Sequence, residues 1–245
     1  MTEDDERHEF SSGQGFEEPY EGFDLDPPEL DVEDPTQVDP VDSRALTDLL
    51  DDRNIAADEV DPDQLIDVGI EYMSINRHEQ AVETFERAAR YAEDDTREAE
   101  AWVSKGIAHG ELEEWDAAVS AHREALHVDE DGEFAALAHT NLAYALWERG
   151  ETEPAFEHAE DAVKADRRVP QAWYNLGFIQ VEQGRHEDAL ECLDNAIRLG
   201  FTESSVYEEK ARALEGLERD EEAAEMRETA TEMQEAEEER LVQQE

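Results

Sequence analysis

Basic residues are scarce in this 245-residue chain. It has 20 Lys and Arg against 70 Asp and Glu, which gives a formal net charge of −50 at pH 7. Proteins bind nucleic acids and anionic membranes through basic surfaces that neutralise phosphate charge. A chain with so few cations has little basic surface to offer. We therefore expect no nucleic-acid partner and no membrane partner.

Cysteine and long apolar runs are missing as well. The single cysteine, Cys192, excludes an internal disulfide and a cysteine-rich zinc site. The longest uncharged stretch, Phe134–Trp147, has 14 residues, whereas a membrane-spanning helix needs about 20 apolar residues. The acidic segment Met1–Glu6 is not followed by an apolar run, so we expect no signal peptide. These absences together predict a cytoplasmic protein.

Lysine is the rarest charged residue. Only three lysines occur, at Lys105, Lys164 and Lys210, so that arginine supplies nearly all of the positive charge. Excess acid, scarce lysine and a low apolar fraction resemble the composition of proteins from halophiles that accumulate salt, such as halophilic archaea. The Debye length falls from about 10 Å at 0.1 M salt to about 3 Å at 1 M, so molar salt would screen the repulsion. The alternative is an ordinary acidic protein with an acidic tail.

The first 42 residues differ from the rest of the chain. They hold 16 Asp and Glu, one Arg and five of the eight prolines, and show no apolar periodicity, which predicts a disordered acidic tail. Phe16, Tyr20 and Phe23 lie among these acids, either as a docking motif or as tail residues without a role. Residues 43–61 predict a short helix and a linker that form an N-terminal cap, because Ser43 can cap a helix with a leucine-rich face.

A ladder of small residues repeats from Pro62 onward. Each unit has a small residue, a second one 12 positions later and a third one 19 positions after the first. The five sets are Gly69, Ala81 and Ala88; Gly106, Ala118 and Ala125; Ala143, Ala155 and Ala162; Gly177, Ala189 and Ala196; and Ala211, Ala223 and Ala230. The units start at 62, 99, 136, 170 and 204. Each unit predicts two helices that cross closely at the small residues and share a core with the next unit.

Two runs in the fourth unit carry a family resemblance. WYNLG at 173–177, followed by GRHEDA at 184–189, resembles the consensus of the tetratricopeptide repeat (TPR) family. The resemblance covers residues 62–237 and implies an all-α fold: a right-handed superhelix, or α-solenoid, of five helix–turn–helix repeats. Residues 238–245 would form the charged end of a capping helix. The proline that is usual at the repeat junctions is largely missing.

The resemblance also implies a binding surface. In the family, the first helix of each repeat lines a concave groove that binds extended peptides or partner helices. That face here comprises Val103, Thr140, Asn141, Tyr144, Trp147, Tyr174, Asn175, Phe178 and Arg212. Asn141 and Asn175 fall where family members hydrogen-bond a peptide backbone, since an amide both donates and accepts. Ile70 and Ile107 share this face, but we expect them to pack between repeats.

The expected function is that of an adaptor or scaffold that binds an apolar or aromatic peptide or helix. The lysines of the family's carboxylate clamp are replaced by residues such as Ile66 and Val103, so a chaperone-tail ligand is disfavoured. Arg212 is the one cation expected on the groove face and could meet an acidic group. The chain's own Phe16, Tyr20 and Phe23 could also occupy the groove. The alternative within the structural class is a subunit of a homo- or hetero-oligomeric complex.

No catalytic motif is present, so we expect no enzyme activity and no cofactor. His78 and His186 each precede a glutamate but lack the second histidine of a zinc-protease motif. His109, His122 and His139 fall on inward positions of the second and third repeats, where they could converge on a metal ion or act as a pH switch. The competing interpretation is that each replaces a packed aromatic residue.

Overall fold

A computed structural model of the chain describes residues 61–242, without the side chains of 237, 241 and 242. The predicted tail, its three aromatic residues and nearly all of the predicted cap and linker lie outside this range. All regular structure within it is helical, which confirms the all-α prediction. The ten helices are α2 (Pro62–Ser74), α3 (His78–Tyr91), α4 (Asp95–Glu111), α5 (Trp115–Val128), α6 (Ala135–Glu148), α7 (Thr152–Ala165), α8 (Pro170–Glu182), α9 (His186–Arg198), α10 (Ser204–Gly216) and α11 (Asp220–Val242).

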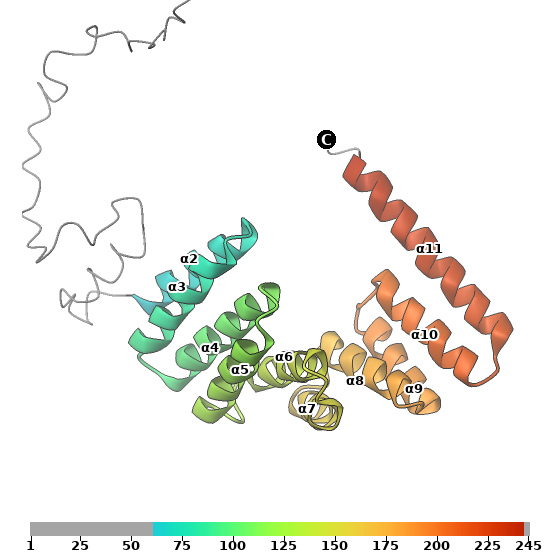
Figure 1. Ribbon diagram of the computed structural model, residues 1–245, viewed down its shortest axis with the longest axis horizontal. Coiled ribbons are helices and arrows are strands. Elements are labelled where there is room, and N and C mark those ends of the chain that lie inside the picture. Colours follow the sequence, from blue (N-terminus) through green and yellow to red (C-terminus); the bar gives the residue numbers. More distant parts are fainter. Residues whose placement is uncertain (1–60, 243–245) are drawn as a thin grey trace, which may run out of the picture. The chain divides into compact units, whose positions relative to one another are not determined.

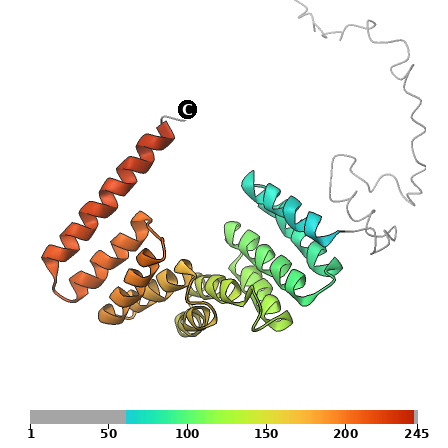
Figure 2. The same cartoon turned by 180° about the vertical axis from the view of Figure 1, so that it is seen from behind.

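Consecutive helices pack side by side as five hairpins (Figures 1 and 2). The first helices of successive hairpins (α2, α4, α6, α8 and α10) also contact one another. Three of them begin at the predicted unit starts 62, 170 and 204, and α6 begins at 135. Helix α4 instead begins at Asp95, because Asp94 caps it by accepting from the Arg97 amide at 2.9 Å. Helix α4 therefore begins before the predicted unit start at 99 and has 17 residues.

A residue in the left-handed conformation joins the two helices of every hairpin. Asn76, Glu113, Gly150, Gly184 and Glu218 have φ between 57° and 79°. In each hairpin the next amide donates to a carbonyl five residues earlier, as Glu114 does to His109 at 2.9 Å. This bond satisfies a carbonyl at the end of the first helix. The backbone pattern holds even at Glu113 and Glu218, where the residue type does not favour it.

In the first four repeats, the first small residue is matched in size to the residue 16 positions later. A Cβ added to Gly69 would overlap the ring of Phe85, and one added to Gly106 would overlap the ring of His122. At Gly177 the added Cβ would lie 2.9 Å from Leu193 Cγ. In the third repeat the pair is Ala143 and Ala159, both fully buried. Glycine is thus used where a large side chain of the second helix fills the crossing.

The last helix, α11, extends well beyond its partner α10. The sequence predicts the charged end of a capping helix at residues 238–245, and the observed helix spans Asp220–Val242. Its small residues Ala223 and Ala230 are buried, whereas most of its remaining described side chains are exposed, and more than half of the exposed ones are acidic. This polar outer face is typical of a terminal capping helix. None of the described helices is long and apolar enough to cross a membrane.

Candidate functional site

Two of the expected groove residues are buried and cannot contact a partner. Val103 and Thr140 are each 1% exposed. Val103 packs against Ala125 and against Ala138 of α6, because the first helix of the next repeat covers it. The hydroxyl of Thr140 donates to the Ala136 carbonyl at 2.7 Å within α6. Their assignment to an open groove is therefore wrong, and both belong to the packing between neighbouring repeats.

Asn175 has a structural partner. Its Nδ2 donates to the Thr140 carbonyl at 3.1 Å, which ties α8 to α6 of the preceding repeat. That amide is thus engaged within the chain instead of being free for a peptide backbone.

The aromatic residues of the third and fourth repeats also pack against each other. Trp147 and Phe178 meet edge to face, with ring centroids 5.1 Å apart. Tyr174 lies against Phe201, with centroids 4.8 Å apart. All three groove candidates are half-buried against the cores of their repeats. Each therefore offers only part of its ring surface to a partner.

Arg212 is exposed but ion-paired. Its guanidinium binds the carboxylates of Glu182 and Glu209, the latter at 2.9 Å. An acidic ligand would have to compete with both, so the expected role of Arg212 as a free cation is not supported. Ile70, which was expected to pack, is instead 53% exposed. Within residues 61–242, more than half of that side chain therefore stays uncovered on α2.

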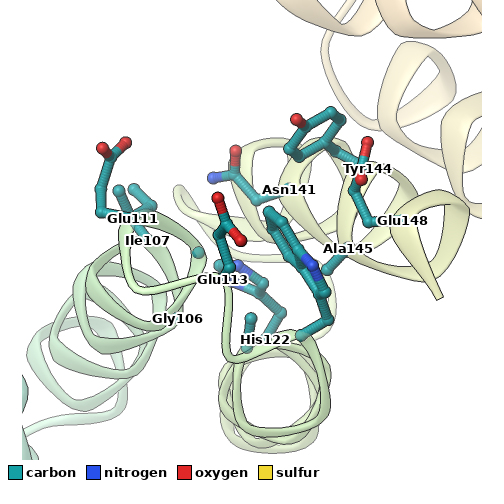
Figure 3. Close-up of a pocket in the computed structure, with 12 residues that line it drawn as sticks. Gly106, Ile107, Glu111, Glu113, His122, Asn141, Tyr144, Ala145 and Glu148 are labelled. Atoms are coloured by element: carbon teal, nitrogen blue, oxygen red, sulfur yellow. The ribbon is translucent and has the colours of Figure 1, made fainter.

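Asn141 and Tyr144 line a cleft of about 500 Å³ between α4, α5 and α6 (Figure 3). The cleft spans the second and third repeats. Its lining comprises Gly106, Ile107, Gly110 and Glu111 from α4, Glu113 from the turn, Trp115, Ala118 and His122 from α5, and Asn141, Tyr144, Ala145 and Glu148 from α6. These two groove candidates are thus brought together with Ile107 and His122, which the sequence also singled out, and with residues such as Trp115 that it did not.

Trp115 and Tyr144 form the aromatic wall of the cleft. Their rings meet edge to face at 86°, with centroids 5.7 Å apart. Tyr144 is 47% exposed, which is unusual for a large ring on a helix face that packs elsewhere. Trp115 is the first residue of α5, a position held by His78, Thr152, His186 and Asp220 in the other repeats. A single large apolar residue at this otherwise polar position is the sequence signal for the cleft.

Two buried polar atoms in the cleft lack a partner among the described residues. They are Nδ2 of Asn141 and Nδ1 of His122. The amide of Asn141 is drawn in Figure 3 above the cleft, beside the side chains of α4. An unpaired buried donor is rare in folded proteins and destabilising, so each such group calls for an explanation. A ligand carbonyl at Asn141 would supply the missing acceptor.

The rim of the cleft is acidic. Burial, together with the charges of Glu148, Glu111 and Glu113, raises the pKa of the Tyr144 hydroxyl. All three carboxylates line the cleft, and no Lys or Arg is among the lining residues. The negative potential in this space therefore favours a cationic group of a ligand over an anionic one.

The three histidines singled out from the sequence do not form one cluster. Nδ1 of His109 lies 2.7 Å from the Glu114 carboxylate, in the turn before α5. His122 is sealed beneath Gly106 and is 1% exposed. His139 pairs instead with His158 of α7, a residue that the sequence did not single out. The alternative that these three histidines converge is therefore wrong, because His122 is buried at the crossing of α4 and α5 whereas His139 pairs across the α6–α7 hairpin.

The family models that match the chain are both described as tetratricopeptide repeat. One matches residues 67–132 and 103–170, and the other matches residues 170–199. Together they cover more than half of the chain. A search of curated proteins found no match.

Solved structures share the fold at low sequence identity. A structure titled as the functional characterization of Pseudomonas aeruginosa pilF is 22% identical, with a TM-score of 0.60 over 70% of this chain and 75% of that chain. MamA from Desulfovibrio magneticus RS-1 is 19% identical, with a TM-score of 0.57 over 71% and 96%. YrrB, titled "a TPR protein with an unusual peptide-binding site", is 17% identical, with a TM-score of 0.55 over 78% and 92%.

Proposed function

Because this chain belongs to the tetratricopeptide repeat family, whose members are typically protein-interaction scaffolds, we propose that it is a non-catalytic adaptor that binds a peptide in the α4–α5–α6 cleft. The observation that carries the proposal is the buried, unpaired amide of Asn141 beside the exposed Tyr144 ring. A buried donor without an acceptor and an exposed aromatic ring are two features expected of a peptide-binding site.

The chemistry of the cleft suggests the ligand. An apolar or aromatic side chain would pack on Trp115 and Tyr144, where buried aromatic surface supplies much of the binding energy. The peptide carbonyl next to it would accept from Asn141 Nδ2. A Lys or Arg one or two residues away would reach the rim carboxylates Glu111 and Glu148. The ligand is therefore proposed to be an apolar and basic segment, in place of the acidic group expected at Arg212.

The same charge argument bears on the intramolecular contact expected from Phe16, Tyr20 and Phe23. The segment around these residues is acidic, and residues 1–42 hold 16 Asp and Glu against one Arg. Carboxylates of the tail would face those of the rim, and this repulsion weakens only at high salt. A basic partner is the better match, and the tail remains the intramolecular alternative.

A selection from a random peptide library displayed on phage tests this proposal. We expect the wild-type chain to enrich peptides in which an aromatic or aliphatic residue lies within two positions of Lys or Arg. A Trp115→Ala/Tyr144→Ala variant, checked for helicity by circular dichroism, should lose this enrichment. Deleting residues 1–42 should leave it unchanged, whereas a tail that occupies the cleft would make the deletion increase recovery. Enrichment of acidic peptides, or equal enrichment by the variant, would overturn the assignment.

A further inference from the structure

Two histidines on adjacent helices of the third repeat meet through the same ring nitrogen. His139 of α6 and His158 of α7 have their Nδ1 atoms 3.0 Å apart. Their rings are tilted by 31°, with centroids 5.2 Å apart. Asp161 follows His158 by one turn of α7, and the candidate ligand atoms of the three residues all lie within 4.8 Å of one another. All three side chains are half-buried, so solvent ions can reach them.

The separation of the two nitrogens fits ligands of one ion. Zn–N bonds are about 2.0–2.1 Å long, so two of them span about 2.8–3.4 Å as the angle between them widens from a right angle to the tetrahedral value. The observed 3.0 Å falls inside this range. The competing explanation is a hydrogen bond between two neutral imidazoles, which needs no third group. The nearby Asp161 carboxylate distinguishes the two, because it completes a ligand set of two imidazoles and one carboxylate.

The surroundings keep the imidazoles available as ligands. Burial lowers the pKa of both His139 and His158, which favours the neutral ring that binds metals. The Asp161 carboxylate also forms an ion pair with Lys164, whose Nζ lies 3.0 Å from Oδ1. Lys164 is 65% exposed, and an exposed ion pair of this kind contributes little stability. The ammonium can therefore move away when a divalent ion takes the carboxylate.

We propose that His139, His158 and Asp161 form a binding site for a divalent transition-metal ion, with Zn²⁺ the best chemical match. The site joins the two helices of the third repeat: α6 supplies His139, and α7 supplies His158 and Asp161. It offers three protein ligands and leaves at least one coordination position open to solvent. It is independent of the peptide cleft, since none of the three residues lines that cleft.

Titration of the untagged, metal-free full chain with ZnCl₂ in a calorimeter tests the proposal. We expect one ion per chain and a rise in melting temperature on addition of zinc. His139→Gln and His158→Gln should each weaken this binding at least tenfold, with helicity retained. His127→Gln is the matched control, because His127 is exposed on α5 and outside the cluster; it should bind as the wild type does.

Competition with a second cation distinguishes zinc bound at the site from zinc bound loosely by the acidic surface. The chain has 70 Asp and Glu, and these carboxylates would bind Mg²⁺ as well as Zn²⁺. We therefore expect zinc to remain bound in excess MgCl₂. Co²⁺ substituted for zinc should give visible absorption bands that disappear in His158→Gln. Zinc affinity equal in the wild type and both His→Gln variants, or full displacement by Mg²⁺, would overturn the proposal and leave a hydrogen-bonded histidine pair.

Discussion

Replacing Gly106 by alanine is expected to destabilise the fold by about 1–3 kcal/mol, the usual range for overpacking a core. The added Cβ would overlap the ring of His122, which is 1% exposed. Gly110 lies one turn further along α4 and is the matched control. Its added Cβ would meet nothing closer than Trp115 Cζ3 at 3.8 Å. Gly110→Ala should therefore stabilise the protein by up to about 1 kcal/mol, the helix propensity gained.

A double-mutant cycle shows whether the overlap is the cause. The third repeat pairs Ala143 with Ala159 at the same crossing, so alanine is tolerated opposite a small residue. In a His122→Ala background, Gly106→Ala should lose most of its destabilising effect. Urea unfolding followed by circular dichroism measures all four proteins. If Gly106→Ala is no more harmful than Gly110→Ala, or if the effect persists without His122, the size-matching explanation is wrong.

Lowering the pH from 7.5 to 5 is expected to reduce the unfolding free energy of the His122→Leu variant by about 2 kcal/mol less than that of the wild type. Burial, with a smaller contribution from the charge of His109, lowers the pKa of His122 from 6.5 to about 4. The unfolded chain therefore binds a proton near pH 6.5, and the folded chain binds it only near pH 4. The wild type has its full stability above pH 6.5 and loses this contribution as the pH falls to about 4.

Leucine is chosen because the chain already uses it at this crossing. Leu193 occupies the corresponding place opposite Gly177 and is fully buried. The measurement is the difference in unfolding free energy between His122→Leu and the wild type at pH 7.5, 6, 5 and 4. Titration of the many carboxylates is common to both proteins and cancels in this difference. Parallel pH profiles for the two proteins would show that folding does not lower the pKa of His122.

The fold followed from local rules that sequence alone reveals. A turn residue with positive φ is required wherever two helices reverse direction tightly, and Gly150, Gly184 and Asn76 supplied it at regular spacing. The small-residue ladder located the crossings because close approach excludes large side chains. With these two constraints the register followed, even through Glu113 and Glu218. The halophilic origin suggested by the composition stays a prediction, and the tail lies outside the described residues.

The site was harder to predict because it depends on how neighbouring repeats cover one another. Thr140 and Tyr144 lie one turn apart on α6, yet Thr140 is 1% exposed and Tyr144 is 47% exposed. Asn141 and Asn175 hold the same position in their repeats, but only Asn175 finds a carbonyl of the preceding repeat. Helix periodicity gives the face of a residue and not the distance to the next helix. The pair of His139 and His158 likewise depends on contact between two helices.

The central claim, that Asn141 contacts the partner while Asn175 holds the repeats together, is tested by one pair of variants. The measurement is the affinity of Asn141→Ala and Asn175→Ala for a peptide selected on the wild type, with unfolding free energy recorded beside it. Loss of a hydrogen bond to a buried carbonyl predicts an affinity about tenfold lower for Asn141→Ala, with stability retained. The Asn175→Ala variant loses the hydrogen bond to the Thr140 carbonyl instead, so we expect unchanged affinity and a loss of about 1 kcal/mol of unfolding free energy. Unchanged affinity in Asn141→Ala, or lost affinity in Asn175→Ala alone, would contradict the account.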